Sequence, residues 1–296
     1  MDASTHRRHV RWTTVSTGAV MSLLMAINGL PSGSGPQSAP PRLVATRFAA
    51  ARPCPRARVV LIGHRGTGPG TRLLDARPFT EDTLPAFKKA MALGADGFET
   101  DYWLTLDAHV VSNHDATLDR TTDGSGPIAG RRWQYVRTLR TSSGAGVPTL
   151  SRVERTMQRY GGLRQQEIKD GAAFSRAKLA WLLERDRRYV PARHVLITSS
   201  EIRTLARVHA IDPAFGTGLI TRRSTARPSM SLLPAWLDVV LIDLRAADAS
   251  YAEKVHAALH LLSVRNVETV TELHRAVALG ADRVLSNFPE RLATAC

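Results

Sequence analysis

The chain has 296 residues, enough for one barrel domain of about 250 residues or for two smaller domains, and either would bury a sizeable core. Its formal net charge is +14, but the basic residues are mostly arginines scattered through every segment, and they are not gathered into one stripe with aromatic partners. That distribution argues against nucleic-acid binding as a main function and is compatible with a general attraction to anionic lipid or polymer surfaces.

The N-terminal segment has the pattern of an export signal. A basic stretch at residues 7–11 precedes a moderately apolar segment at residues 13–30, and Pro and Gly residues follow at 31–36. Thr, Ser and Asn side chains make the apolar segment too polar for a typical membrane span. We therefore expect residues 1–56 to be a signal peptide and linker, and the protein to be secreted or extracytoplasmic. A retained N-terminal membrane anchor is the alternative.

The first predicted strand ends in two polar side chains. Residues 59–62 form an apolar run that predicts a buried strand, and it is followed by His64 and Arg65 between two glycines. The strand would deliver an imidazole and a guanidinium to one rim of a sheet. Beyond an irregular loop at 67–79, Thr80 is predicted to cap a helix whose apolar residues recur at helical spacing.

Two further runs repeat this construction. Residues 96–101 predict a strand in which Glu99 and Asp101 share a face, because side-chain direction alternates along a strand. A run at residues 109–113 then ends in His114. Histidines and carboxylates close to strand ends are typical of the C-terminal rim of a barrel of parallel strands.

The middle of the chain contributes a loop and a charged strand. Residues 115–147 are rich in Thr, Gly and Ser, and Trp133 and Tyr135 are predicted to anchor a small lid there. The run at 163–168 predicts a strand in which Glu167 shares a face with Lys169. Taken alone, this charged sequence is more typical of a solvated turn.

Strand and helix patterns alternate regularly after residue 170, which favours an α/β fold with a parallel sheet, and we expect a single TIM (β/α)8 barrel. The expected helices span residues 172–188, 200–210, 251–260 and 270–279, with a short one near 232–236, and the expected strands span 195–198, 216–220, 239–244, 261–264 and 283–286. With the earlier runs this gives nine candidate strands for eight barrel places, so either the run at 109–113 or the run at 261–264 should be accessory.

Five motifs in order carry a resemblance to a known family: His64-Arg65-Gly66, Glu81-Asp82-Thr83, Glu99-x-Asp101, His114-Asp115 followed by Arg120-Thr121-Thr122, and Glu167-x-Lys169. Together they resemble the signature set of the glycerophosphodiester phosphodiesterases, over about residues 59–292. The resemblance implies a barrel domain at 57–296 that hydrolyses phosphodiesters. The order of the five motifs along the chain is more specific for the family than any single motif.

The chain departs from the family pattern at three places. Asp82 replaces the asparagine of the usual Glu-Asn-Thr, and an ionised carboxylate only accepts hydrogen bonds. On a late strand, Leu262-Ser263-Val264-Arg265-Asn266 stands in place of a Trp-Thr-Val-Asn stretch, and Ser286-Asn287-Phe288-Pro289 replaces Thr-Asp-x-Pro. Without the tryptophan an aromatic wall is missing, so the family's usual substrate preference is not expected to carry over.

The resemblance places a metal ion on Glu99, Asp101 and Glu167. Three carboxylates without a thiol suit a hard divalent cation such as Ca2+ or Mg2+, and without an ion they would repel one another. His64 and His114 then fit a general acid and base pair, although the sequence does not say which is which. Arg65 and Lys169 would bind the phosphoryl oxygens.

The only two cysteines, Cys54 and Cys296, would lie at the bottom face of a barrel, where the first strand begins and the last helix ends. Export would place them where disulfides persist, so a bridge and two free thiols are both open. Their number and spacing exclude a cysteine-based zinc site.

The expected function is that of a secreted, metal-dependent phosphodiesterase that hydrolyses small or lipid-derived glycerophosphodiesters to glycerol phosphate and an alcohol. By resemblance, a substrate hydroxyl next to the phosphodiester attacks first and gives a cyclic phosphate. Anionic membrane or cell-wall polymer surfaces are the expected partners. One alternative is a phospholipase D-like enzyme on lysophospholipid or sphingomyelin-type headgroups. The other is a non-catalytic barrel that binds glycerophosphate polymers.

Overall fold

The computed structural model describes residues 59–69 and 79–295. The predicted signal peptide and linker and both cysteines lie outside the described residues, as does most of the loop predicted at 67–79. Within the described part of the chain, no helix is both long enough and apolar enough to cross a membrane.

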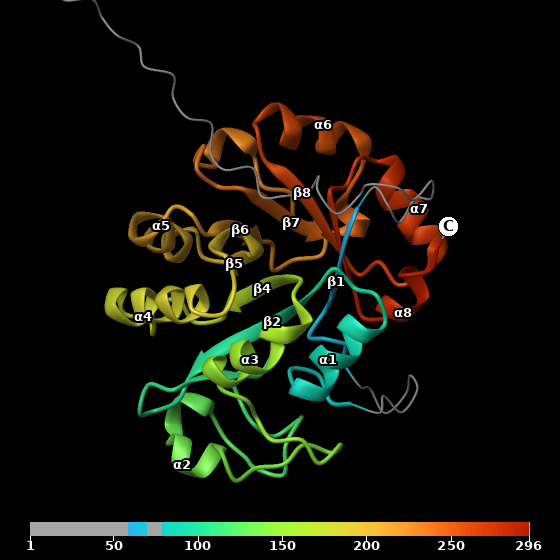
Figure 1. Ribbon diagram of the computed structural model, residues 1–296. Coiled ribbons are helices and arrows are strands. Elements are labelled where there is room, and N and C mark those ends of the chain that lie inside the picture. Colours follow the sequence, from blue (N-terminus) through green and yellow to red (C-terminus); the bar gives the residue numbers. More distant parts are fainter. Residues whose placement is uncertain (1–58, 70–78, 296) are drawn as a thin grey trace, which may run out of the picture. The chain divides into compact units, whose positions relative to one another are not determined.

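Parallel strands close into a barrel, which confirms the predicted TIM fold (Figure 1). The strand order around the ring is β1-β9-β8-β7-β6-β5-β4-β2, and pairing of β1 with β2 closes it. The ring strands are β1 (Val60–Gly63), β2 (Gly97–Leu104), β4 (Leu163–Ile168), β5 (Val195–Ser199), β6 (Gly216–Ile220), β7 (Val239–Asp243), β8 (Leu261–Arg265) and β9 (Arg283–Ser286).

The ninth predicted strand is accessory. β3 (Val110–Ser112) pairs antiparallel with the end of β2, with Tyr102 opposite Ser112, and lies outside the ring. β2 has eight residues, more than any other described strand, so its last part is available for this pairing. Of the two candidates for the accessory strand, the run at 109–113 is therefore the correct one, and the run at 261–264 is β8.

Helices follow the strands on the outside of the ring (Figure 1). They are α1 (Leu84–Ala92), α3 (Leu150–Met157), α4 (Arg176–Arg187), α5 (Ile202–Ile211), α6 (Ala249–Ala257), α7 (Val270–Ala278) and α8 (Pro289–Leu292). The short helix α2 (Trp133–Val136) lies in the segment after β3 and packs on a separate apolar cluster. The short helix predicted near 232–236 is instead a single 3-10 turn at Met230–Leu232, ahead of Pro234, which removes a backbone donor.

The predicted cap of α1 is also wrong. Thr83, not Thr80, is the N-cap residue, and its hydroxyl donates to the Thr80 carbonyl at 2.6 Å. The reason is Asp82, whose φ of 56° is left-handed and therefore incompatible with a helix that begins at Thr80.

Side-chain alternation separates the barrel interior from the layer beneath the helices. In β1, Val60 and Ile62 pack with Leu241 and Leu285 inside the ring, whereas Leu61 joins the cluster shared with α6 and α7. Apolar side chains fill much of the interior, where Arg283 also donates to Gln165 Oε1 at 3.5 Å, and the polar side chains that follow the strands lie at the C-terminal rim. This is the end at which barrel enzymes carry out their chemistry.

Candidate active site

β2 and β4 bring three carboxylates together at this rim. Glu99 and Asp101 lie two residues apart on β2, and Glu167 lies on β4 beside Asp101 in the parallel register. One oxygen of each carboxylate lies within 4.8 Å of the others. Glu99 and Asp101 are buried and Glu167 is partly buried. The three predicted metal ligands therefore converge.

Burial and mutual repulsion disturb the ionisation of these carboxylates. Burial and then the charge of Asp101 raise the pKa of Glu99 well above its usual range, and they raise the pKa of Glu167 to about 7. Burial acts on Asp101 in the same direction, but Lys169 and Arg65 outweigh it and hold the pKa of Asp101 below its ordinary value. Without a further cation, two of the three carboxyls resist ionisation.

The cluster fits a hard divalent cation. Both carboxylate oxygens of Asp101 are buried and accept no hydrogen bond from the described residues. Their nearest cations are Lys169 Nζ at 3.3 Å and Arg65 Nε at 3.5 Å. Buried anionic oxygens with free lone pairs are the ligands that Ca2+ and Mg2+ take in proteins, and the donor set offers nothing softer.

The two predicted phosphate-binding residues flank the cluster. Arg65 follows β1, its backbone N–H donates to Glu99 Oε2 at 2.8 Å, and its guanidinium donates to Glu81 Oε1 at 2.9 Å. Lys169 follows β4 and lies 3.3 Å from both Asp101 Oδ1 and Glu167 Oε2. Both cations line the same cavity.

His64 is held by a residue that the sequence reading did not assign to the site. Its Nδ1 lies 2.6 Å from Asn287 Oδ1, and Asn287 Nδ2 donates to Glu268 Oε1 at 2.9 Å. Because the amide nitrogen is used by Glu268, the amide oxygen faces the ring, so Nδ1 carries the proton and Nε2 is an acceptor. Burial and the charge of Arg65 lower the pKa of His64 to about 3.

His114 follows β3 and faces a carboxylate instead. Its Nδ1 lies 2.7 Å from Asp115 Oδ1, and Arg120 Nε donates to Asp115 Oδ2 at 2.6 Å. Arg120 also donates to both oxygens of Glu81, and Arg65 donates to Oε1 of the same carboxylate. Burial is the main cause that lowers the pKa of His114, while the hydrogen bond to Asp115 opposes it.

Asp82 occupies the asparagine position of the family motif and retains hydrogen bonds. Its Oδ1 accepts from the Asp101 backbone N–H and from Ser112 Oγ, both at 3.1 Å. Burial, Asp101 and Glu81 raise the pKa of Asp82 well above its usual range. The neutral carboxyl has one donor and one acceptor group, as an asparagine amide does.

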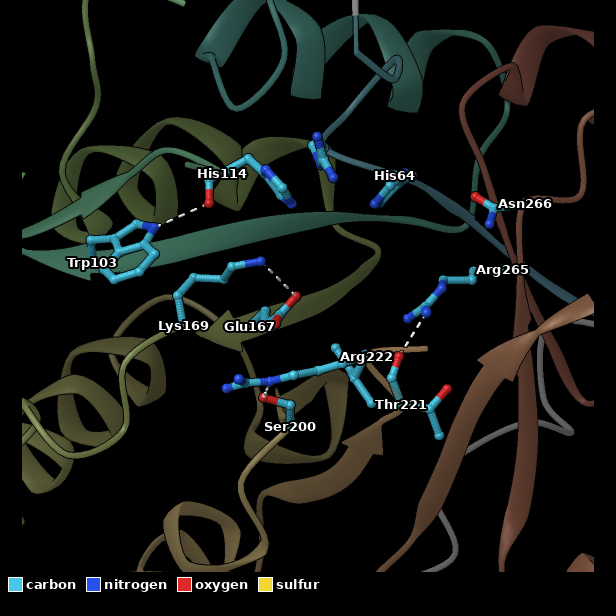
Figure 2. A pocket seen from close by; sticks show the side chains of 12 residues that line it. His64, Trp103, His114, Glu167, Lys169, Ser200, Thr221, Arg222, Arg265 and Asn266 are labelled. Carbon is cyan, nitrogen blue, oxygen red and sulfur yellow. Dashed lines mark hydrogen bonds and ion pairs between the residues drawn. The ribbon is translucent and has the colours of Figure 1, made fainter. Parts of the chain in front are cut away.

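Some of these side chains line a cavity of about 540 Å³. Figure 2 shows His64 and His114 on one side, facing Glu167, Lys169 and Arg222 across it. The remaining lining residues are Arg65, Trp103, Ser200, Ile220, Thr221, Arg265 and Asn266.

The family model described as the glycerophosphoryl diester phosphodiesterase family matches residues 64–291, a range that contains all the predicted site residues. The chain belongs to this family. A glycerophosphodiester phosphodiesterase of Caldanaerobacter subterraneus subsp. tengcongensis is 26% identical to it over 250 residues, 79% of this chain and 96% of the relative. Glycerophosphodiester phosphodiesterase 1 of Rattus norvegicus is 41% identical over 85 residues, 29% of this chain and 23% of the relative.

Solved structures share the fold of this family member. An Oleispira antarctica phosphodiesterase, determined in complex with the product sn-glycerol-3-phosphate, aligns with a TM-score of 0.69 at 22% identity and covers 78% of this chain and 94% of its own. A phosphodiesterase of this type from Galdieria sulphuraria, described as putative in that structure, aligns with a TM-score of 0.69 at 18% identity, over 79% and 96% of the two chains.

The sequence patterns did not point to all residues of the cavity. In the segment predicted as a lid, Trp133 packs against a small apolar cluster and Tyr135 is 38% exposed, and neither lines the cavity. The cavity-lining residues that were missed include Trp103, Arg222 and Arg265. Arg265 is the last residue of β8 and Arg222 follows β6 closely, so the strand-end rule that selected the histidines would also have found these arginines.

Proposed function

We propose that this protein is a metal-dependent glycerophosphodiester phosphodiesterase that releases glycerol phosphate and an alcohol. The observation that carries the proposal is the convergence of Glu99, Asp101 and Glu167, of which Glu167 lines a cavity that two histidines also line. Family membership supports the same reaction class. Glu167, the two phosphate-binding cations and the two proton carriers then line one cavity.

Glu99, Asp101 and Glu167 would hold Ca2+ or Mg2+, which when bound neutralises charge on the phosphoryl group. Arg65 and Lys169 bind the non-bridging phosphoryl oxygens through charge-assisted hydrogen bonds. Their ion pairs with Glu81 and the carboxylate cluster fix both cations before substrate arrives. Little reorganisation is therefore needed as charge develops on the phosphoryl oxygens.

The partners of the two imidazoles suggest different roles. His64 faces the neutral amide of Asn287 and keeps Nε2 as an acceptor, so it is the base that takes the proton of the attacking glycerol hydroxyl. His114 faces the carboxylate of Asp115, which opposes the lowering of the His114 pKa by burial, so we assign it as the acid. The hydroxyl oxygen bonds to phosphorus, the bond to the alcohol breaks, and His114 protonates the departing alkoxide. Water then opens the cyclic phosphate with the roles reversed.

The test is a hydrolysis screen with the purified full-length chain. Glycerophosphocholine and glycerophosphoglycerol are incubated with EDTA, and then with Ca2+ or Mg2+ in excess, and released glycerol phosphate is measured. We expect activity only with added metal, and a loss of at least about a hundredfold in Glu167→Gln and His114→Ala. Glu184→Gln, an exposed carboxylate on α4, is the matched control and should retain full activity.

Absence of hydrolysis with either metal would contradict the proposal. Activity that is unchanged in His114→Ala would contradict the acid assignment. Lysophospholipid vesicles form a separate arm of the screen, in which headgroup release without activity on water-soluble diesters would favour the phospholipase D-like alternative.

We also propose that the enzyme works outside the cytoplasm and is drawn to anionic surfaces there. The proposal is supported by the signal-like residues 1–56 and by the net charge of +14. Fractionation of cells that express the full chain, with N-terminal sequencing of the mature protein, tests the location. A product that stays in the cytoplasm with its first residues intact would contradict it.

A further inference from the structure

Arg265 places a guanidinium in the cavity without a carboxylate partner. It is the last residue of β8, and one guanidinium nitrogen donates to the Thr221 carbonyl at 2.6 Å. It forms no ion pair with a carboxylate of the described residues. Burial lowers the pKa of Arg265, and the charges of Asp243 and Glu167 oppose that effect only in part. The positive charge of Arg265 is therefore available to a ligand.

Asp243 and Glu167 are the carboxylates whose charges raise the pKa of Arg265, and both have other partners. Asp243 lies beside it in register on β7, but its Oδ2 accepts from Asn266 Nδ2 at 2.6 Å and its Oδ1 accepts a backbone N–H at 2.9 Å. Glu167 lies 3.3 Å from Lys169 and belongs to the carboxylate cluster. Both charges act on Arg265, but neither carboxylate forms an ion pair with its guanidinium.

Arg222 adds a second cation on the same side of the cavity. It follows Thr221, the residue whose carbonyl holds Arg265, and its Nε donates to Ser200 Oγ at 2.8 Å. Its guanidinium lies 3.8 Å from the carboxylate of Glu201, and its side chain is 70% exposed, which makes this a weak ion pair. Figure 2 shows both arginines across the cavity from His114.

The cavity holds more positive charge than one phosphodiester requires. A phosphodiester carries one negative charge, and Arg65 and Lys169 already flank the cluster where its phosphorus would lie. Among the described residues, neither Arg222 nor Arg265 forms an ion pair with that cluster, so both guanidiniums can meet a second anionic group. Guanidinium groups bind phosphate oxygens in preference to neutral hydroxyls, because both partners are charged.

We propose that Arg265 and Arg222 form an anion subsite for the alcohol side of the substrate, so that the enzyme prefers glycerophosphodiesters whose alcohol carries a second phosphate. The inference rests on the proposed function, since it names the substrate class of the same site. A choline or ethanolamine headgroup would instead bring a like charge toward two guanidiniums. Soluble bis(glycerophospho)glycerol and polyglycerolphosphate share the required chemistry.

A matched set of substrates tests this preference. We compare kcat/KM for bis(glycerophospho)glycerol, corrected for its two equivalent diesters, with kcat/KM for glycerophosphoglycerol and glycerophosphocholine. We expect a preference of roughly tenfold for the substrate with the second phosphate over glycerophosphoglycerol, and the lowest value for glycerophosphocholine. In Arg265→Gln and in Arg222→Gln the preference should fall severalfold. Arg223→Gln, an exposed arginine that does not line the cavity, should keep it.

Equal kcat/KM for the three substrates, a preference for glycerophosphocholine, or an unchanged ratio in Arg265→Gln would overturn the subsite. Titration calorimetry with the inactive variant His114→Asn measures substrate binding without turnover. It therefore separates failure of the subsite from failure of the proposed function. Tighter binding of bis(glycerophospho)glycerol than of glycerophosphoglycerol, lost in the double variant with Arg265→Gln, supports the subsite even if nothing is hydrolysed. Digestion of polyglycerolphosphate shows whether the preferred source is polymer or soluble diester.

Discussion

Glu167→Gln should change the stability of this protein in opposite directions with and without metal. In EDTA the ionised carboxylate of Glu167 is unfavourable, because burial and Asp101 raise its pKa from 4.5 to about 7. When a carboxyl pKa is higher in the folded state than in the unfolded state, stability is lost as the pH rises from the unfolded-state pKa through the folded-state pKa. The difference between the two pKa values lowers the free energy of unfolding by at most about 3 kcal/mol above pH 8.

The assay is thermal unfolding of wild type and Glu167→Gln at pH 8.5. In EDTA the variant should melt higher, by up to roughly 6–10 °C for a domain of this size. With millimolar Ca2+ or Mg2+ the order should reverse, since the wild type keeps three anionic ligands and gains the stability that ligand binding gives to a native state. The control Glu184→Gln alters an exposed ion pair with Arg188 and should differ little from wild type in either buffer.

Two results would refute this reasoning. One is a Glu167→Gln variant that melts lower than wild type in EDTA, because its ion pair with Lys169 would then outweigh the repulsion from Asp101. The other is wild-type stability in EDTA that shows no decline between pH 4.5 and 7.

Three further changes have defined outcomes. Asn287→Leu removes the acceptor of the His64 Nδ1 proton, so kcat should fall about 10- to 100-fold in steady-state assays while KM changes little. Arg164→Met leaves the fully buried Glu154 without its ion pair, and urea unfolding should show a loss of about 3–5 kcal/mol; a change below 1 kcal/mol would be contrary to this account. Asp82→Asn removes a carboxyl with a raised pKa, so in EDTA its melting temperature should exceed that of wild type at alkaline pH, and the gap should close as the pH falls.

Local sequence patterns predicted the parts of the site that depend on strand periodicity. Glu99 and Asp101 share a face because they lie two residues apart on a strand, and the parallel register then sets Glu167 beside them. The partner of His64 was not predictable in this way. Asn287 lies 223 residues away in the sequence, and only closure of the ring through pairing of β1 with β9 brings the two together.

Element boundaries failed where a single side chain or dihedral angle decides them. α4 was predicted from residue 172, yet it begins at Arg176 because the hydroxyl of Ser175 accepts from the Lys178 N–H and caps it there. The start of α1 likewise depends on the left-handed backbone of Asp82, which periodicity does not report. The parallel sheet followed from the alternation of strands and helices, since parallel strands need helical crossovers, whereas its closure into a ring was expected from the polar strand ends and the family resemblance.

One carboxylate, that of Glu81, accepts hydrogen bonds from Arg65 at 2.9 Å and from Arg120 at 2.6 Å. Arg65 is next to His64 in the chain, and Arg120 donates to Asp115, which contacts His114. His64 and His114 are thus both linked to the carboxylate of Glu81, and a shift at the start of α1 would displace both imidazoles together. Among descendants of this chain, residues 65, 81 and 120 should therefore be inherited as a set, with a change at one tolerated only alongside changes at the others.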